Sequence, residues 1–340
     1  MPRMPHARSK QSQATPSPPI PSQAISSQAT ADTQAPEAMP PEGASPERVA
    51  PVAGGIELCY QTFGDPIADP LLLVMGLGGP MTWWDPDFCG MLAAAGFFVI
   101  RYDNRDTGRS SRARGRVSRR MLVQSFLGPA ARGPRPPYTL DEMAADAFGL
   151  LDHLGLGTAH VVGVSMGGMI VQTMAVLQPA RVRSLTSIMS TTGRRTVGWQ
   201  DPRLLPMLLA RSVPTREGYV AGSARLWKVI GSPGYPETAA VVQERAGETW
   251  DRGVSPAGVA RQMVAILNQP DRSRRLRELS MPALVIHGLD DKMVHVSGGR
   301  ATSQAIPGSE LLLVPGMGHD VPAELRETFT EAIRRTADRA

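Results

Sequence analysis

The stretch HVVGVSMGGMI, residues 160–170, decides the fold of this chain. Its first five residues form an apolar run that suits a strand buried on both faces of a sheet. Ser165 follows in the pattern Gly163-Val164-Ser165-Met166-Gly167, and a second apolar run starts shortly after it. The pattern predicts a sharp turn from strand to helix, at which glycines relieve crowding and the serine hydroxyl is exposed. That hydroxyl would lie at a helix N-terminus, where free N–H groups favour developing negative charge.

A serine hydroxyl needs a base, and one of the six histidines is well placed to supply it. His319 lies in the stretch VPGMGHDVP, a glycine-flanked loop directly after the last predicted strand. Both it and Ser165 should therefore lie at the carboxyl edge of the sheet. The stretch VIHGLDD supplies Asp290 and Asp291 after the preceding strand, and a carboxylate there could fix the tautomer of the histidine. His287, in the same stretch, is interpreted as a packed histidine at a strand end.

Apolar runs and helix-like segments alternate along most of the chain. This pattern predicts an α/β fold, a mainly parallel sheet covered by helices on both faces. Thr139 with Glu142 predicts a capping box at one helix start. Strands are expected at 56–64, 70–76, 97–103, 159–164, 182–191, 283–288 and 310–316, and helices at 85–96, 139–156, 166–178, 297–306 and 322–335.

Two segments break the alternation. Residues 193–280 contain helix-like segments and no convincing strand, so they are expected to form a helical cap inserted before the penultimate strand of a core made of residues 48–192 and 281–340. Residues 1–47 are rich in Pro, Ser, Gln and Ala and are expected to be a disordered tail.

Composition narrows the classes of function. The net charge is +5, with arginines densest over residues 101–135, but no nucleic-acid-binding motif accompanies them and a solvated loop is expected. The two cysteines, Cys59 and Cys89, predict neither a disulfide framework nor a zinc site. No apolar stretch is long enough for a membrane span, and no secretory signal is recognisable, so a cytoplasmic location is expected.

From about residue 50 onward the chain resembles the α/β-hydrolase family. The resemblance is carried by LLLVMGLGG (71–79), RYDNRDTGRSS (101–111), VVGVSMGGMI, VIHGLDD and VPGMGHD. It implies a nucleophile at Ser165, a base at His319 and, by the family's spacing, an orienting carboxylate at Asp291. The implied oxyanion hole consists of the backbone N–H groups of Leu77 and Met166.

Shorter stretches of the sequence narrow the resemblance. RDTGRS and VMG are similar to a subgroup typified by the aclacinomycin methylesterases, although Met75 stands where many relatives have histidine. Asp103, Arg105 and Asp106 are expected to bind their loop together. Trp83 and Trp84 could line an acyl pocket or belong to the core.

The leading hypothesis is therefore a serine enzyme that hydrolyses a carboxylic ester of a small hydrophobic substrate through an acyl-enzyme, without metal or organic cofactor. Ser165 argues against haloalkane dehalogenases and epoxide hydrolases, which use an aspartate at this turn. Two alternatives remain open: a cofactor-free perhydrolase of haloperoxidase type, and a non-catalytic small-molecule receptor on the same scaffold. The natural ester and the oligomeric state are left open by the sequence.

Overall fold

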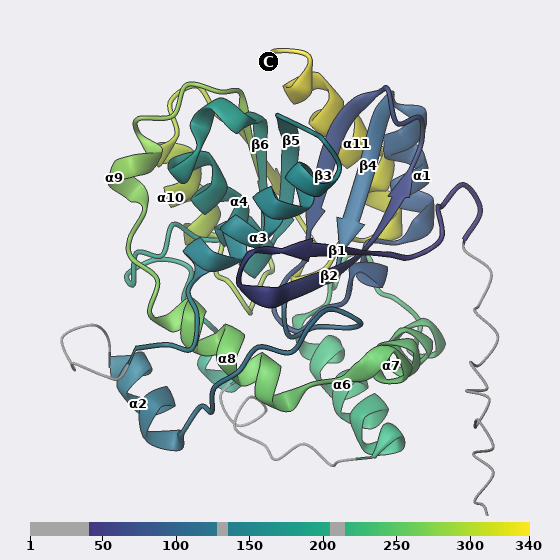
Figure 1. Ribbon diagram of the computed structural model, residues 1–340. Coiled ribbons are helices and arrows are strands. Elements are labelled where there is room, and N and C mark those ends of the chain that lie inside the picture. Colours follow the sequence, from purple (N-terminus) through teal and green to yellow (C-terminus); the bar gives the residue numbers. More distant parts are fainter. Residues whose placement is uncertain (1–40, 128–134, 205–214) are drawn as a thin grey trace, which may run out of the picture. The chain divides into compact units, whose positions relative to one another are not determined.

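Eight strands form one sheet, in the order β1-β2-β4-β3-β5-β6-β7-β8. The computed structural model describes residues 41–127, 135–204 and 215–340, which all lie in the compact unit Met39–Ala340 (Figure 1). Only the β1–β2 and β2–β4 pairs are antiparallel, so strands β3 to β8 end at one common edge. The strands are β1 Arg48–Val52, β2 Ile56–Phe63, β3 Asp69–Val74, β4 Phe97–Tyr102, β5 Ala159–Val164, β6 Val182–Ile188, β7 Ala283–Gly288 and β8 Glu310–Val314.

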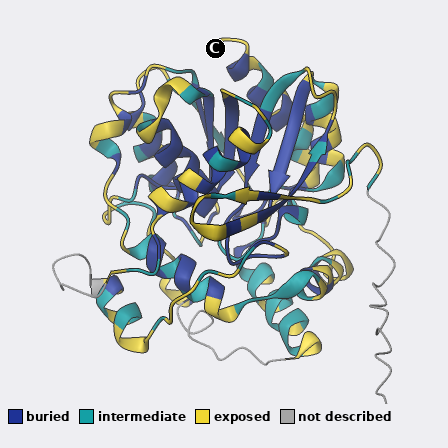
Figure 2. Ribbon diagram, viewed as in Figure 1, coloured by how far each residue is buried: buried dark blue, intermediate teal, exposed yellow. Residues whose placement is uncertain are grey.

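Helices cover both faces of the sheet, which is why β4, β5 and β7 are buried at every residue (Figure 2). One core cluster unites the sheet with α3, α4 and α10, and the other unites it with α1 and α11. The capping box of Thr139 and Glu142 starts α3 as predicted. The predicted fold class is confirmed. These helices are α1 Pro86–Ala94, α3 Leu140–His153, α4 Met166–Leu177, α10 Ser297–Ala305 and α11 Arg326–Ala337.

A group of helices lies between β6 and β7 in the chain, in the segment expected to form a cap. They are α6 Arg216–Ile230, α7 Ala239–Gly253, α8 Pro256–Leu267 and the short α9 Ser273–Leu276. In Figure 1, α6, α7 and α8 lie together beyond the end of the sheet toward which the arrow of β4 points. They therefore lie beyond the carboxyl edge, where the site was expected.

Two expectations need correction. The solvated loop expected over the arginine-rich residues 101–135 contains a helix, α2 Arg119–Leu127, which packs against α8. Asn268 Nδ2, directly after α8, donates a hydrogen bond to Ser125 Oγ of α2 at 2.8 Å. The expected tail also extends too far, because Ser45 N–H bonds to the Thr62 carbonyl at 2.8 Å and so joins β2. Residues 1–40 of that tail lie outside the described residues.

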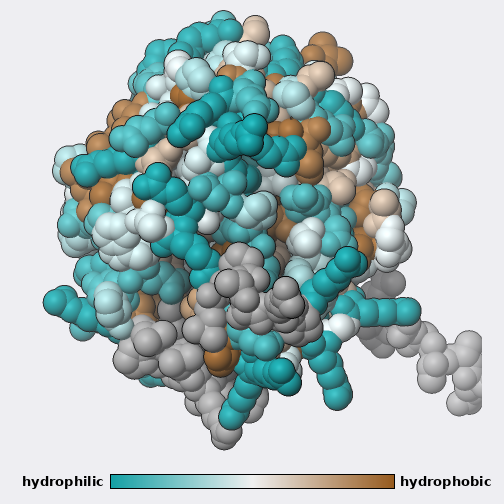
Figure 3. Space-filling model, turned by 90° about the vertical axis from the view of Figure 1, so that its left-hand side faces the viewer, coloured by the Kyte–Doolittle hydropathy of each residue, from teal (hydrophilic) through white to brown (hydrophobic). Residues whose placement is uncertain are grey.

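None of the helices in residues 41–127, 135–204 and 215–340 is long and apolar enough to cross a membrane. Figure 3 shows one face of the molecule, on which hydrophilic and hydrophobic residues are mixed.

Candidate active site

Ser165 occupies a strained turn between β5 and α4. Its φ of 56° and ψ of −117° lie outside the regions that L-residues prefer. Glycines permit this turn, because a Cβ on Gly163 would overlap the backbone of Gly167, and a Cβ on Gly167 would overlap the carbonyl of Val74 in β3. The expected strand–turn–helix geometry is therefore present.

Ser165, His319 and Asp291 form one continuous hydrogen-bonded chain. The distance from Ser165 Oγ to His319 Nε2 is 3.0 Å, and that from His319 Nδ1 to Asp291 Oδ2 is 2.8 Å. The two bonds join residues 154 and 28 positions apart in the sequence. This is the arrangement in which a histidine accepts a proton from a serine while a carboxylate fixes its tautomer.

The Asp291 carboxylate is held on both of its oxygens. Oδ1 accepts hydrogen bonds from the N–H groups of Met293 at 2.8 Å and Val294 at 2.9 Å, which leaves Oδ2 for His319. Burial alone raises the pKa of Asp291, but the nearby His319 and His287 outweigh this, and the pKa lies below its ordinary value. The carboxylate is therefore an anion at neutral pH.

His287 is buried beside this carboxylate, and the expectation of a packed histidine at a strand end holds. Its Nε2 lies 2.8 Å from the Val294 carbonyl and 3.5 Å from Asp291 Oδ2. Because a carbonyl accepts only, Nε2 carries the proton. The ring packs so closely on α10 that a Cβ on Gly299 would overlap it.

The loop that carries His319 is fixed by the end of α6. The His319 N–H bonds to the Ile230 carbonyl at 2.7 Å, and the Gly318 N–H bonds to Ser232 Oγ at 2.8 Å. Ser232 Oγ in turn donates to Asp320 Oδ1, and burial raises the pKa of Asp320. Helix α6, and not only the sheet, thus positions the imidazole.

The loop after β3 lies directly against the serine. A Cβ on Gly76 would come within 3.2 Å of Ser165 Cβ. The next amide, Leu77 N–H, and the first amide of α4, Met166 N–H, donate to no residue of the part of the chain that the structure describes. Both amides are thus unpaired among the described residues, and they are the two that the resemblance implies as an oxyanion hole.

Asp103 and Asp106 bind their loop together, as expected, and they also bind helices α7 and α8. Asp103 accepts hydrogen bonds from Met81 N–H at 2.7 Å and Arg109 N–H at 2.8 Å. Its carboxylate pairs with Arg252 of α7 at 2.7 Å, and that of Asp106 pairs with Arg261 of α8 at 2.6 Å.

These partners on α7 and α8, and a third, Gln262, were not predicted from the sequence. Arg105 of the same loop pairs instead with Asp146 of α3, at 2.5 Å. No local pattern distinguishes Arg252 or Arg261 among the 36 basic residues as the partner of a carboxylate about 150 residues away. These two pairs therefore could not be predicted from the sequence.

The two tryptophans differ in their surroundings. Trp83 faces the cap: its Nε1 donates to Thr249 Oγ1 of α7 at 2.9 Å, and its ring meets that of Trp227 of α6 edge to face at 5.5 Å. Trp84 is 1% exposed and stacks on Phe88 in the core. These surroundings favour a pocket role for Trp83 and a core role for Trp84.

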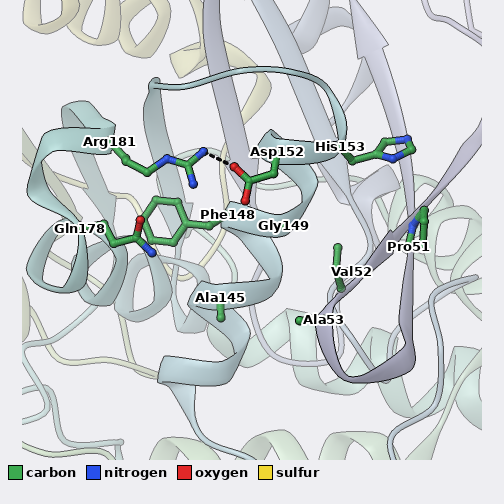
Figure 4. Close-up of a pocket in the computed structure, with 10 residues that line it drawn as sticks. All are labelled: Pro51, Val52, Ala53, Ala145, Phe148, Gly149, Asp152, His153, Gln178 and Arg181. Atoms are coloured by element: carbon green, nitrogen blue, oxygen red, sulfur yellow. Dashed lines mark hydrogen bonds and ion pairs between the residues drawn. The ribbon is translucent and has the colours of Figure 1, made fainter.

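A groove of about 510 Å³ lies elsewhere, between β1 and α3 (Figure 4). Arg181, paired with Asp152 at 2.6 Å, and Gln178 line it. Both follow the end of α4, whereas Ser165 precedes its start, and a helix of 12 residues is roughly 18 Å long. The groove is therefore not part of the site. Among the described residues, no three His, Cys, Asp or Glu side chains are grouped as metal ligands.

Known proteins are similar to this chain in sequence. The sequence model of a family described as the alpha/beta hydrolase fold matches residues 69–324. The chain is 30% identical over 301 residues to rhodomycin D methylesterase DnrP of Streptomyces peucetius, which covers 82% of this chain and 94% of that protein.

Solved structures share the fold. The structure of the enol-lactonase from Burkholderia xenovorans LB400 matches with a TM-score of 0.66 at 24% identity, covering 86% of this chain and all of that one. The structure of a thermophilic esterase from Thermogutta terrifontis matches with a TM-score of 0.63 at 25% identity, covering 86% and 97%.

Proposed function

Because the chain belongs to the α/β-hydrolase family, we propose that it is a serine hydrolase that cleaves a carboxylic ester of a small hydrophobic substrate. The observation that carries the proposal is the hydrogen-bonded chain from Ser165 Oγ through His319 to Asp291 Oδ2. The open amides of Leu77 and Met166 beside the serine support it.

Acylation is the first half of the reaction. Ser165 Oγ attacks the ester carbonyl carbon while its proton passes to His319 Nε2, and the carbonyl oxygen becomes an oxyanion. The N–H groups of Leu77 and Met166 stabilise that oxyanion, which forms at the N-terminus of α4. The bond to the leaving oxygen then breaks, and His319 returns the proton to the departing alkoxide. The products are the free alcohol and an acyl group on Ser165.

Deacylation repeats these roles with water. His319 removes a proton from a water molecule, which attacks the acyl carbonyl, and the proton then returns to Ser165 Oγ as the acid leaves. Asp291 stays ionised throughout and stabilises the imidazolium. Its two backbone hydrogen bonds and lowered pKa suit this role.

The class of substrate is supported by two observations. A relative at 30% identity is named as a methylesterase, which favours an ester bond. Trp83 and Trp227 meet where the loop after β3 faces the cap, which favours an apolar group on the substrate. We propose on these grounds that residues 193–280 act as the cap that selects the substrate.

A panel of p-nitrophenyl esters of increasing acyl length, given to the wild type and to Ser165→Ala, tests the proposal. The wild type should release p-nitrophenol, and Ser165→Ala should lower turnover by several orders of magnitude while the far-ultraviolet circular dichroism stays unchanged. Wild-type rates in purified Ser165→Ala would refute the proposal. Peroxide-dependent halide oxidation in acetate without ester turnover would indicate a perhydrolase, and ligand binding without any turnover would indicate a receptor.

A further inference from the structure

We propose that Gln262, on cap helix α8, is a positioning residue for the oxyanion hole. The side chain lies 184 residues away in sequence from the amide that it holds, Gly78 N–H, and it is fully buried. The inference rests on the proposed function, because it concerns the same site, but its structural part can be tested without substrate.

Gln262 uses both ends of its amide. Oε1 accepts the Gly78 N–H at 2.8 Å, and Nε2 donates to the Arg105 carbonyl at 2.9 Å and to Thr107 Oγ1 at 3.0 Å. If the amide were flipped, its NH₂ group would face the Gly78 N–H and its oxygen would face the Arg105 carbonyl. These partners therefore fix the orientation of the amide. Gln262 therefore joins the loop after β3 to the loop after β4.

The bond to Gly78 controls a turn. Gly79 N–H bonds to the Gly76 carbonyl at 3.2 Å, which makes residues 76–79 a β-turn, and the φ of +65° at Gly78 is typical of type II. In such a turn the peptide between Leu77 and Gly78 can face either way, since types I and II differ by its rotation. Gln262 selects one orientation by accepting the N–H.

The closed turn matters to the serine. Leu77 N–H belongs to the preceding peptide, whose carbonyl accepts the Gly79 N–H, and this peptide therefore keeps its orientation as long as the turn stays closed. Catalysis by an oxyanion hole depends on donors that are already in place when charge develops. Holding Gly78 therefore keeps one of the two proposed donors aimed at the substrate oxygen.

Helix α8 also packs directly on this turn. A Cβ on Gly78 would come within 2.9 Å of Val259 Cγ2, one turn before Gln262 on the same helix. Arg261, adjacent to Gln262, fixes the helix to the core through Asp106 at 2.6 Å. The position of α8 therefore sets the shape of the oxyanion hole, and a ligand that shifts the cap also changes the hole.

Gln262→Met removes the acceptor with little change in volume. We expect kcat for the best ester to fall about 10- to 100-fold with KM changed less than about threefold, because the interaction acts in the transition state. Gln262→Glu keeps an acceptor for Gly78 and should retain more of kcat. Asn268→Leu is the matched control: it removes another amide of α8, which bonds to Ser125 Oγ and the Val264 carbonyl, and it should leave kcat unchanged.

Amide hydrogen exchange of the peptide that carries Leu77 and Gly78 completes the test. Exchange should become faster in Gln262→Met than in the wild type or Asn268→Leu, and this readout needs no ester turnover, so it separates this inference from the proposed function. If Gln262→Met does not fold, the same comparison is made with Gln262→Asn, whose shorter side chain keeps an amide but does not reach the Gly78 N–H. Three results would overturn the inference. The variant that removes the acceptor could keep both the exchange rate and the kcat of the wild type, it could change KM alone, or Asn268→Leu could lose as much kcat as that variant.

Discussion

Asp290 and Asp291 are adjacent in the sequence, yet their carboxylates serve different loops. Asp291 Oδ2 faces His319 Nδ1 at 2.8 Å, whereas Asp290 Oδ2 accepts the Gly316 N–H at 2.9 Å and so ties the turn after β8 to the turn after β7. The spacing that selects Asp291 by resemblance thus agrees with the contacts in the structure.

Asp291→Asn should therefore lower kcat for the best ester by about 10³- to 10⁴-fold, since an amide lets His319 adopt the wrong tautomer. Asp290→Asn should cost less than about tenfold, because it changes only the contact between the turns. Steady-state kinetics of the two variants side by side make the comparison. A dead Asp290→Asn beside an active Asp291→Asn would show that the roles are reversed.

Arg261→Met should destabilise the protein, because it leaves the buried Asp106 carboxylate with only Tyr138 Oη at 2.7 Å and the Ala113 N–H at 2.9 Å. Removing one partner of a buried pair costs about 3–5 kcal/mol, so urea unfolding should show a loss of that size. The double variant Arg261→Met, Asp106→Asn should recover part of the lost free energy of unfolding.

Arg216→Met provides the control for that experiment. Arg216 pairs with Asp251 at 2.9 Å, but both side chains are at least half exposed. Such a pair contributes little, so the unfolding midpoint should not move. An equal loss in the two arginine variants would show that burial of the Arg261 pair is not the cause.

The stability of the protein should depend on the protonation of His160. Burial, with Arg183 nearby, lowers the pKa of His160 from 6.5 to about 4. Between about pH 4 and about pH 6.5 the unfolded chain binds the proton more tightly than the folded protein does. The contribution of neutral His160 to the free energy of unfolding is therefore fully present above about pH 6.5 and is lost as the pH falls toward about 4. Between about pH 7.5 and about pH 5 the loss from this residue should be about 2 kcal/mol.

His160→Leu should remove that contribution, because the replacement cannot titrate. Its free energy of unfolding, measured by urea titration at a series of pH values, should fall less steeply than that of the wild type over the same range. Parallel curves for the two proteins would mean that His160 is not the group responsible.

Truncation should show where the folded unit begins. Glu47 pairs with Arg252 at 2.6 Å. Ser45 donates its N–H to the Thr62 carbonyl at 2.8 Å and accepts the Thr62 N–H on its Oγ at 3.1 Å. The protein that lacks residues 1–47 should therefore be less stable than the protein that lacks residues 1–40. The difference in the free energy of unfolding should be about 1–3 kcal/mol. Thermal melts of the two truncated chains measure the difference, and identical melting temperatures would contradict it.

The parts of the site that were predictable from the sequence depend on short-range patterns. Gly163 and Gly167 flank Ser165 because the turn excludes side chains there, and Thr139 with Glu142 lie three residues apart because a helix start requires it. The distinction between Asp290 and Asp291 came only from family spacing.

The parts that were missed depend on tertiary contacts. Helix α2 lies in a stretch whose glycines, prolines and arginines are typical of a loop, and its support is α8, a distant segment. Arg252 and Gln262 likewise reach their partners across 149 and 184 positions, so the local sequence around them looks like any exposed helix.

The pairing of Asp103 with Arg252 and of Asp106 with Arg261 limits how the specificity of this protein can be re-engineered. A foreign cap grafted onto the core would leave two interior carboxylates without cations unless it carried arginines at matching positions. Chimaeras that keep Arg252 and Arg261 while replacing other residues of α6 and α7 should therefore express as folded protein more often than transplants of the whole segment.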